Sequence, residues 1–472
     1  MMSSILTVNN NKNKCQKFTP SDLVEKMLDL ADYKSELMGK TVLENSFGSG
    51  NILKEIVVRY IKSALKDGYS LQDISSGLGR DIYGIELDKE LFENCLSELN
   101  NITEKFSMPK VDWNLINGNA LDTRLNCKFD YIIGNPPYIS YREMDEDSRT
   151  ILKQKFNSCS EGKFDYCYAF LEMSVNLLST KGKLVQLIPN NIYKNVFGKN
   201  LRNILSEHIE FIYDYPNQKI FDKTLTSVSI FLYDKTVDTD MVTYVNKTQN
   251  TQKTLSRQHL GEKWTFENQN STLNKKVRFG DYFNASIAIA TLLNEAFIID
   301  EEIISKENLE AEVIRKAVSP RALRYKKKMY IIFPYKYEND KLIRYTESEF
   351  INLFPNVAMH LKKYIDKLEL RNSDSSAQWF EYGRSQALAH LNTEKLLLST
   401  IITNDVELYK INAETIPYSG VYITLKSDKY CLSDALRILK DPDFLEYARN
   451  IGISVNGKSI RITCKDINDY EF

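Results

Sequence analysis

Short β-rich runs alternate with helix-length segments through the first half of this 472-residue chain. The clearest runs are "TVLENSFGSG", "DIYGIELD", "VDWNLINGNAL" and "FDYIIGNPPY". Strands separated by helices need crossover connections, which make the strands parallel and leave helices on both faces of the sheet. Further strands are expected in "GKLVQLIPN", "IEFIYDYPN" and "SVSIFLYD". The pattern therefore predicts an α/β unit that closes near residue 235.

The alternation stops near residue 240, where a polar stretch without a clear period begins. Because the chain is too long for one typical core, we expect two domains, residues 1–240 and residues 241–472. The formal net charge of −1 gives no general attraction to nucleic acid or membranes, so such a partner would need a local patch. The basic cluster "RKAVSPRALRYKKK", residues 315–328, is the candidate for that patch.

Cysteine and histidine usage bears on metals and on the cell compartment. The seven cysteines include no CxxC pair, and only four histidines accompany them. This usage argues against a zinc site and a disulfide framework, and we expect no metal. The polar start "MMSSILTVNNNKNK" does not resemble a signal peptide, and no apolar run reaches the length of a membrane span. We therefore expect a cytoplasmic protein without a membrane partner.

Two acids and a glycine turn stand at the ends of the first two strands. Glu44 ends the first strand, and Gly48 and Gly50 allow a tight turn before a helix whose N-terminus offers N–H donors. Glu86 ends the next strand, where an acid can accept both hydroxyls of a ribose. An ordinary turn and a solvated acid at a helix start, with Asp88, are the alternatives. The dinucleotide and phosphate-loop fingerprints are incomplete, but the two features together favour a ribose-containing ligand.

The later strands end in polar turns as well. Asn119, in "INGNAL", could contact a base edge or could simply be a turn residue. In "FDYIIGNPPY" two prolines fix the backbone and remove two N–H donors. The Asn135 side-chain oxygen and the Pro136 carbonyl are then available as acceptors beside the Tyr138 ring. Such a site suits a planar group with an NH2; a rigid turn with a packed tyrosine is the alternative.

With the glycine turn, the Glu86 strand and Asn-Pro-Pro-Tyr in this order, the sequence resembles the S-adenosylmethionine-dependent amino-methyltransferases. It is most similar to the TaqI-like gamma group of N6-adenine DNA methyltransferases. Phe18, Thr19 and Pro20, in "QKFTPSDLVEKMLDLA", match the Phe/Tyr-Thr-Pro element that precedes the first helix of that group. The resemblance covers roughly residues 15–235. It implies a Rossmann-like class I S-adenosylmethionine-dependent methyltransferase fold with a C-terminal α+β target-recognition domain.

The resemblance also implies which residues bind the cofactor, S-adenosyl-L-methionine. They are Phe18, Thr19, Pro20, Glu44, Ser46, Gly48, Gly50, Glu86, Asn119, Ala120 and Asn135. Glu44 and the glycine turn would hold the methionine portion, Glu86 the ribose, and Asn119 the adenine amino group. The family usually has Asp in place of Asn119 and Pro-Ala in place of Asn45 and Ser46. Neither departure removes an acceptor, so we expect altered affinity rather than loss of binding.

The resemblance also implies catalytic residues, which accept hydrogen bonds from the target base or stack on it. They are Asn135, Pro136, Pro137, Tyr138 and Phe197. Phe197, in "YKNVFGKNLR", aligns with an aromatic that stacks on the extruded base. Acceptors for both hydrogens of the adenine amino group make its nitrogen more nucleophilic, and no metal or covalent nucleophile is required. A base in a duplex must first be flipped out, at a cost of about a few kcal/mol.

The C-terminal half is then expected to recognise double-stranded DNA. The candidates for phosphate contacts are Arg321, Arg324, Lys326, Lys327 and Lys328. A solvated basic face is the alternative for this cluster. Trp379 and Arg384, in "WFEYGRSQAL", could also meet DNA, although Trp379 could equally be a core anchor.

Two other functions stay open. One is a methyltransferase that acts on a protein glutamine or an RNA base, since similar turns bind those planar groups. The other is a non-catalytic DNA-specificity protein on a methyltransferase fold, against which the intact Asn-Pro-Pro-Tyr turn and both acids argue. The chain shows no convincing nuclease cluster. Cleavage, if it occurs, is expected from a separately encoded restriction endonuclease of a restriction-modification system, and the alternative is an orphan methyltransferase.

Overall fold

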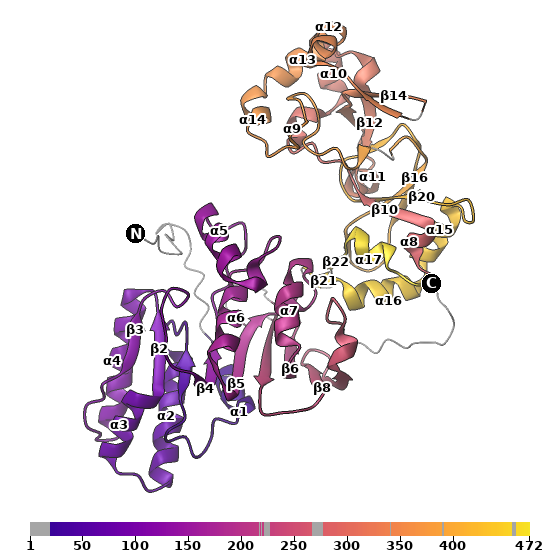
Figure 1. Ribbon diagram of the computed structural model, residues 1–472. Coiled ribbons are helices and arrows are strands. Elements are labelled where there is room, and N and C mark those ends of the chain that lie inside the picture. The colour runs from indigo at the N-terminus through magenta and orange to yellow at the C-terminus, as the bar shows by residue number, and fades with distance from the viewer. Residues whose placement is uncertain are drawn as a thin grey trace. The chain divides into compact units, whose positions relative to one another are not determined.

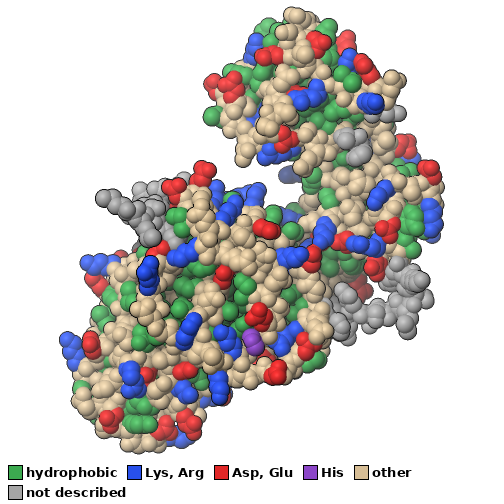
Figure 2. All heavy atoms as spheres, in the orientation of Figure 1, with side chains coloured by type: hydrophobic (Ala, Val, Ile, Leu, Met, Phe, Trp, Pro, Cys, Tyr) green, Lys and Arg blue, Asp and Glu red, His purple; other side chains and the backbone are tan. Residues whose placement is uncertain are grey.

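The structure is a computed structural model that describes residues 19–216, 218, 220, 227–266, 277–339, 341–388, 391–455 and 459–472. The chain forms two compact units, Met1–Asn268 and Gln269–Phe472. We call them the N-terminal unit and the C-terminal unit. Figure 1 shows the elements of both. On the face shown in Figure 2, acidic and basic side chains are interspersed over each unit.

A nine-stranded sheet forms the centre of the N-terminal unit, in the order β3-β2-β1-β4-β5-β7-β6-β8-β9 (Figure 1). Its strands are β1 (Val42–Glu44), β2 (Ile82–Glu86), β3 (Asn114–Asn117), β4 (Phe129–Gly134), β5 (Leu178–Pro189), β6 (Ile209–Tyr215), β7 (Val228–Asp234), β8 (Met241–Asn246) and β9 (Thr251–Ser256). The first five strands pair in parallel, and β7 lies antiparallel between β5 and β6. The predicted parallel pairing is confirmed for β1 to β5, but the sheet as a whole is mixed, because β7 and β9 pair antiparallel with their neighbours.

Helices cover both faces of this sheet. They are α1 (Ser21–Leu30), α2 (Asn51–Lys66), α3 (Leu71–Asp81), α4 (Lys89–Lys105), α5 (Glu146–Lys155), α6 (Cys167–Leu177) and α7 (Lys199–Leu205). Successive strand residues face opposite cores: Val42 lies in the core with α1, α2, α3 and α4, and Leu43 in the core with α6 and α7. Burial on both faces explains why β4 and β5 are apolar runs rather than alternating ones.

Helix α3 is an element that the sequence pattern did not predict. Its sequence, LQDISSGLGRD, contains two glycines, which are poor helix formers. Both glycines allow close packing, because a Cβ at Gly77 would lie 2.4 Å from the Tyr60 hydroxyl and one at Gly79 would lie 2.5 Å from the Asp112 carbonyl oxygen. The Ser70 side chain caps the helix by accepting from the Asp73 N–H.

The division between the units also differs from the expected one. The boundary lies after residue 268 and not at residue 240. The reason is the β8–β9 hairpin: β8 pairs in parallel with β6, and β9 pairs antiparallel with β8, so both strands extend the sheet. The polar residues that follow residue 240, as far as residue 256, thus belong to the N-terminal unit.

The C-terminal unit has an α+β architecture with short, mostly antiparallel strands. Its sheets have the orders β10-β20-β16-β18, β11-β13-β12-β19, β14-β15 and β17-β22-β21. The strands are β10 (Phe283–Ile287), β11 (Ile298–Ile299), β12 (Ile314–Val318), β13 (Met329–Ile332), β14 (Tyr335–Glu338), β15 (Lys341–Arg344), β16 (Lys395–Leu398), β17 (Ile401–Ile402), β18 (Leu408–Ile411), β19 (Ile416–Pro417), β20 (Val421–Leu425), β21 (Ile453–Ser454) and β22 (Ile460–Arg461). The expected α+β class is confirmed for this unit.

The helices of the C-terminal unit are short. They are α8 (Phe279–Tyr282), α9 (Asn294–Phe297), α10 (Glu301–Glu307), α11 (Pro320–Arg324), α12 (Glu347–Leu353), α13 (Pro355–Lys362), α14 (Ile365–Glu369), α15 (Leu432–Lys440), α16 (Pro442–Ile451) and α17 (Cys464–Asn468). Two buried apolar clusters of this unit are separate from the two that flank the large sheet. Within the described ranges of the whole chain, no helix has both the length and the apolar character of a membrane span.

Candidate functional site

The glycine turn lies at the carboxyl end of β1, as the sequence predicts. Gly48 (φ +53°) and Gly50 (φ +75°) both have left-handed backbone conformations, which glycine adopts without strain. A Cβ at Gly50 would lie 2.2 Å from the Cys95 Sγ, whereas a Cβ at Gly48 would meet nothing within 4 Å. Helix α2 begins at Asn51. The turn is therefore fixed by backbone conformation and, at Gly50, by a close neighbour.

Glu86 connects the end of β2 to this turn. One oxygen of its carboxylate accepts the Gly48 N–H and the other accepts the Asp88 N–H, each at 2.8 Å. Asp88 itself caps α4 by accepting from the N–H groups of Glu90 and Leu91. The helix-capping role that the sequence left open for these acids thus belongs to Asp88. The Glu86 carboxylate lies at the glycine turn, where a ribose contact is expected.

Glu44 is the most unusual acid at this edge of the sheet. Its side chain is 2% exposed, and its Oε2 has no hydrogen-bond partner among the described residues. Burial, and next the nearby Glu86 charge, raise the pKa of Glu44 well above its usual range. A buried acceptor without a partner is costly in an isolated protein. It fits a ligand that brings a cationic or N–H donor group, such as the amino group of a bound methionine moiety.

The Asn-Pro-Pro-Tyr turn begins directly after β4. The Asn135 Nδ2 donates to the Thr19 Oγ1 at 3.2 Å, and the Asn135 main-chain carbonyl accepts from the Ser46 Oγ at 3.2 Å. Pro136 is buried, and no donor within the described ranges bonds its carbonyl. The donor end of the Asn135 carboxamide is therefore held by Thr19, while the turn keeps a carbonyl acceptor beside it.

The Thr-Pro element joins the two turns. Thr19 is 4% exposed, and its carbonyl accepts from the Asn51 Nδ2 at 3.0 Å. Its hydroxyl accepts from Asn135, 116 positions further along the chain. Pro20 occupies the N-cap position of α1. Phe18 lies outside the described residues. The predicted element is thus brought next to the glycine turn and the Asn-Pro-Pro-Tyr turn.

The two predicted stacking aromatics differ in how they are held. The Tyr138 ring is partly buried, and its hydroxyl donates to the Leu187 carbonyl at 2.9 Å. Pro137, beside it, is also partly buried. Phe197 lies in the short helix η3 (Val196–Gly198) and is 41% exposed. The exposed Phe197 ring is accessible to a ligand, and its stacking role stays a prediction.

Asn119 and Ala120 follow β3 and form a local turn. The Asn119 Oδ1 accepts the Leu121 N–H at 3.1 Å, and its Nδ2 donates to Asp122 at 2.9 Å. Ala120 is 5% exposed and packs in the core. The side chain of Asn119 thus has the turn role that the sequence left open, and its contact with a cofactor base stays an expectation.

Sequence reasoning missed Gln186, which lies beside the Asn-Pro-Pro-Tyr turn. It is fully buried in β5, directly across from Gly134, and neither atom of its amide has a partner among the described residues. The point where a Gly134 Cβ would lie is 3.6 Å from the Gln186 Nε2 and 3.7 Å from the Asn45 Oδ1. A glutamine inside the apolar run "KLVQLIP" was the available signal. Buried polar side chains therefore lie next to Gly134, the residue that precedes Asn135.

Leu87 and Asp165 were also missed. Leu87 follows Glu86 and is 51% exposed, so it offers an apolar surface next to the expected ribose contact.

Asp165 receives a long hydrogen bond from the Asn191 Nδ2 (3.5 Å), and burial raises the pKa of its carboxyl to about 6. The Tyr166 N–H donates to the Ile139 carbonyl, which ties this segment to the chain just after Tyr138.

The predicted basic cluster lies on α11 and the turn after it. Its members Arg321, Arg324, Lys326, Lys327 and Lys328 are all exposed. Arg324 pairs with Glu407 at 2.6 Å, and Lys328 lies 4.0 Å from Glu301. The other three have no ion pair in the part of the chain that the structure describes.

Trp379 and Arg384 are engaged within the C-terminal unit. The Trp379 indole N–H donates to Glu347 at 2.7 Å, and its ring packs against the core. Arg384 pairs with Asp374 at 2.9 Å. These contacts support the anchor role that the sequence left open for Trp379 and give Arg384 a similar one. DNA contacts by this pair stay a prediction.

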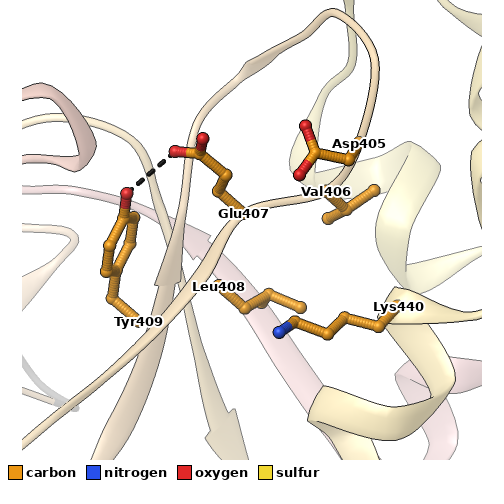
Figure 3. Close-up of a pocket in the computed structure, with 6 residues that line it drawn as sticks. All are labelled: Asp405, Val406, Glu407, Leu408, Tyr409 and Lys440. Atoms are coloured by element: carbon orange, nitrogen blue, oxygen red, sulfur yellow. Dashed lines mark hydrogen bonds between the residues drawn. The ribbon is translucent and has the colours of Figure 1, made fainter. Parts of the chain in front are cut away.

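A hollow of about 320 Å³ lies in the C-terminal unit (Figure 3). Its lining residues are Asp405, Val406, Glu407, Leu408, Tyr409 and Lys440. In Figure 3 the Tyr409 hydroxyl donates to Glu407, the acid that also pairs with Arg324. None of the predicted cofactor or catalytic residues lines it. Across the described ranges no three His, Cys, Asp or Glu side chains are arranged to hold a metal ion.

Comparisons with known proteins point to one group. The family model described as "Eco57I restriction-modification methylase" matches residues 51–221. The Type II methyltransferase M.BstVI of Geobacillus stearothermophilus is 28% identical over 47% of this chain and 42% of its own length. The Type II restriction enzyme and methyltransferase RM.Eco57I of Escherichia coli is 23% identical over 82% of this chain and 48% of its own length. The chain thus spans about half the length of these relatives, and the resemblance to restriction-modification methylases is confirmed.

A solved structure extends the likeness over both units. The Type IIL restriction-modification enzyme MmeI, in complex with DNA, matches 95% of this chain and 64% of its own chain, with a TM-score of 0.60 and 15% identity. The predicted fold class, a Rossmann-like class I methyltransferase fold followed by an α+β domain, is confirmed by this likeness and by the sheet order. The cofactor of this fold class is S-adenosyl-L-methionine.

Proposed function

We propose that this chain, whose residues 51–221 match the restriction-modification methylases, methylates the N6 amino group of adenine in duplex DNA. The observation that carries the proposal is the hydrogen-bonded junction of Thr19, Ser46 and Asn135. It joins the glycine turn, expected to hold the cofactor, to the turn expected to hold an amino group. A methyl donor and a methyl acceptor would therefore meet at one edge of the sheet.

The residues at this edge fit the cofactor. The Glu44 carboxyl, whose Oε2 has no partner among the described residues, suits the amino group of the methionine portion, and the Glu86 carboxylate suits the ribose. The exposed Leu87 side chain offers a surface for the adenine ring. Bound S-adenosyl-L-methionine supplies an electrophilic methyl group on a sulfonium.

The Asn-Pro-Pro-Tyr turn would prepare the attacking nitrogen. The Asn135 side-chain oxygen and the Pro136 carbonyl accept the two hydrogens of the adenine amino group. These bonds draw the nitrogen lone pair out of conjugation with the ring and raise its nucleophilicity. The nitrogen would gain a bond to the methyl carbon as the carbon–sulfur bond of the sulfonium breaks and leaves a neutral thioether. One hydrogen of the nitrogen would then leave to solvent as a proton. Tyr138 and Phe197 would stack on the base, each worth about 1–3 kcal/mol.

Double-stranded DNA is the proposed substrate because the C-terminal unit carries an exposed basic cluster. Phosphate contacts by this cluster position DNA without reading its sequence. The base must be flipped out of the duplex to reach the Asn-Pro-Pro-Tyr turn. A separately encoded restriction endonuclease is the proposed partner in a restriction-modification system.

The direct test is transfer of a labelled methyl group. Purified protein is incubated with labelled S-adenosyl-L-methionine and unmethylated duplex DNA, RNA or a glutamine-containing protein such as a release factor. The proposal predicts label in duplex DNA, recovered as N6-methyladenine after digestion. Label in RNA or protein, but in no DNA, would establish the alternative methyltransferase function instead.

A further inference from the structure

The ring of Phe197 is exposed, yet its position is closely defined. Phe197 follows β5 by way of the short helix η2 (Asn190–Tyr193). Its neighbour Val196 is 47% exposed, and Phe197 is 41% exposed. An exposed side chain normally samples several rotamers, and fixing one costs entropy. A ring that serves as a stacking platform benefits from being fixed before the base arrives.

The Phe197 ring packs closely against Gly162. A Cβ at Gly162 would lie 1.9 Å from the Phe197 Cδ1 and 2.3 Å from its Cε1, so the phenyl ring would have to move away. The backbone of Gly162 is also left-handed, with φ +62°. Gly68, with φ +86°, has the same backbone requirement but open space where its Cβ would lie. The contact with the ring is therefore a separate requirement for glycine at position 162.

Arg202, on α7, holds the chain that carries the ring. Its side chain is 2% exposed, and its Nη1 donates to the carbonyls of Ile192 and Asn195, both at 2.7 Å. Its Nε donates to the Glu262 carbonyl at 2.7 Å. The Asn195 side chain in turn accepts the Phe197 N–H at 3.2 Å. The turn that precedes Phe197 is therefore held by hydrogen bonds from a buried side chain.

Burying a guanidinium against neutral carbonyls is costly. Burial lowers the pKa of Arg202 to about 10, so that the side chain is still charged at neutral pH. An apolar residue would fill the same volume without this cost, but it could not bond three carbonyls. Two of these hydrogen bonds hold the segment from Ile192 to Asn195, which connects the buried Ile192 and Tyr193 to the exposed Val196 and Phe197.

We infer that Gly162 and Arg202 are positioning residues that fix the Phe197 ring in advance, ready to stack on a flipped base. The inference rests on the proposed function, since it assigns the ring to base stacking. It adds two residues that do not touch the base. Gly162 contacts the Phe197 ring, and Arg202 holds the backbone that precedes it.

The test compares Gly162→Ala with Gly68→Ala, which imposes a similar backbone strain in open space. Single-turnover methylation is measured on a duplex that carries the target found by sequencing methylated DNA. We expect Gly162→Ala to slow methylation by about tenfold or more, with unchanged affinity for S-adenosyl-L-methionine. Gly68→Ala should match the wild type. A duplex with 2-aminopurine at the target should fluoresce more strongly with Gly162→Ala, because a stacked ring no longer quenches the flipped base.

A double variant separates positioning from simple loss of folding. Phe197→Ala removes the atoms that a Gly162→Ala methyl would strike, so the double variant should recover the part of the thermal stability that Gly162→Ala loses beyond the loss in Gly68→Ala. It should also methylate no more slowly than Phe197→Ala alone. Wild-type rates for Gly162→Ala, or a further rate loss in the double variant, would overturn the inference while leaving the proposed function intact. A wild-type protein that methylates no DNA would overturn both.

Discussion

At the scale of single residues, the amide nitrogen of Asn135 is held by a hydrogen bond, and its amide oxygen is the group proposed to act on the base. Its Nδ2 is bonded to Thr19 and its main-chain carbonyl to Ser46. The remaining acceptor of the carboxamide is the group assigned to the adenine amino group. Because Asn135, although also expected to line the cofactor site, is assigned mainly to the base, methyl transfer should be affected far more than cofactor binding when it is changed.

Asn135→Ala should therefore abolish methyl transfer while changing the affinity for S-adenosyl-L-methionine only slightly. Loss of an acceptor used in the transition state is expected to cost about 100-fold or more in rate. Affinity is measured by calorimetry and transfer by labelled methyl incorporation. Full activity in Asn135→Ala would show that the acceptor pair has been assigned wrongly.

Glu44 gives the site a dependence on pH. Its pKa in the isolated protein is raised by burial and next by Glu86. A cationic amino group beside it would favour the ionised carboxylate and lower that pKa, so binding should release a proton. Affinity for S-adenosyl-L-methionine should then rise with pH up to the pKa of the free protein and level off above it.

The measurement is calorimetric titration in two buffers of different ionisation enthalpy, between about pH 5 and pH 7.5. The wild type should show proton release, and Glu44→Gln should show none and bind more weakly. Proton uptake, or the same proton release in Glu44→Gln, would exclude contact between Glu44 and the amino group.

At the scale of elements, the β1–α2 turn has a matched pair of glycines. Gly48 and Gly50 share the left-handed backbone, but only Gly50 lies against Cys95. Gly48→Ala should cost about 1–2 kcal/mol from backbone strain. Gly50→Ala should cost about 1–3 kcal/mol more, because its methyl strikes the Cys95 Sγ.

A double-mutant cycle isolates the clash. In a Cys95→Ala background the nearest remaining atom at position 50 is the Cβ at 3.3 Å. Gly50→Ala should then cost about as much as Gly48→Ala, measured as the free energy of unfolding in denaturant. Equal costs of Gly50→Ala with and without Cys95 would mean that the turn relaxes around the added methyl.

The elements also show what sequence can and cannot reveal. The Gly48–Gly50 turn, the strand ends at Glu44 and Glu86, and the Asn-Pro-Pro-Tyr turn were predicted because each depends on local chemistry: backbone freedom, strand periodicity and missing N–H donors. Two other contacts depend on packing between distant segments. They are the hydrogen bond between Thr19 and Asn135 and the packing of Phe197 against Gly162. Pairing of β8 with β6 is long-range in the same way. No local pattern specifies such contacts.

At the scale of the whole molecule, the two units have different proposed tasks. The N-terminal unit carries the residues assigned to the cofactor and the base, and the C-terminal unit carries the basic cluster on α11. Net charge is near zero, so attraction to DNA must come from local cations. Arg321, Lys326 and Lys327 are the members of the cluster without an ion pair in the described ranges.

Changing these three to glutamine should weaken DNA binding by a similar factor on every sequence. It should also lower the slope of log affinity against log salt, by about 1 for each phosphate that is no longer neutralised. The control is Lys34→Gln, Lys62→Gln and Lys66→Gln, three exposed lysines of the N-terminal unit. Fluorescence anisotropy over a salt series measures both. If the two triple variants have the same slope, the cluster is a solvated face.

The central claim is that Asn135 activates adenine in duplex DNA. It is tested most directly by expressing the wild type and Asn135→Ala in a bacterial host without adenine methylation and sequencing the genome by long reads that detect modified bases. We expect N6-methyladenine at one recurring sequence with the wild type and none with Asn135→Ala. A wild-type genome without modified adenine, or the same modification with Asn135→Ala, would contradict the claim.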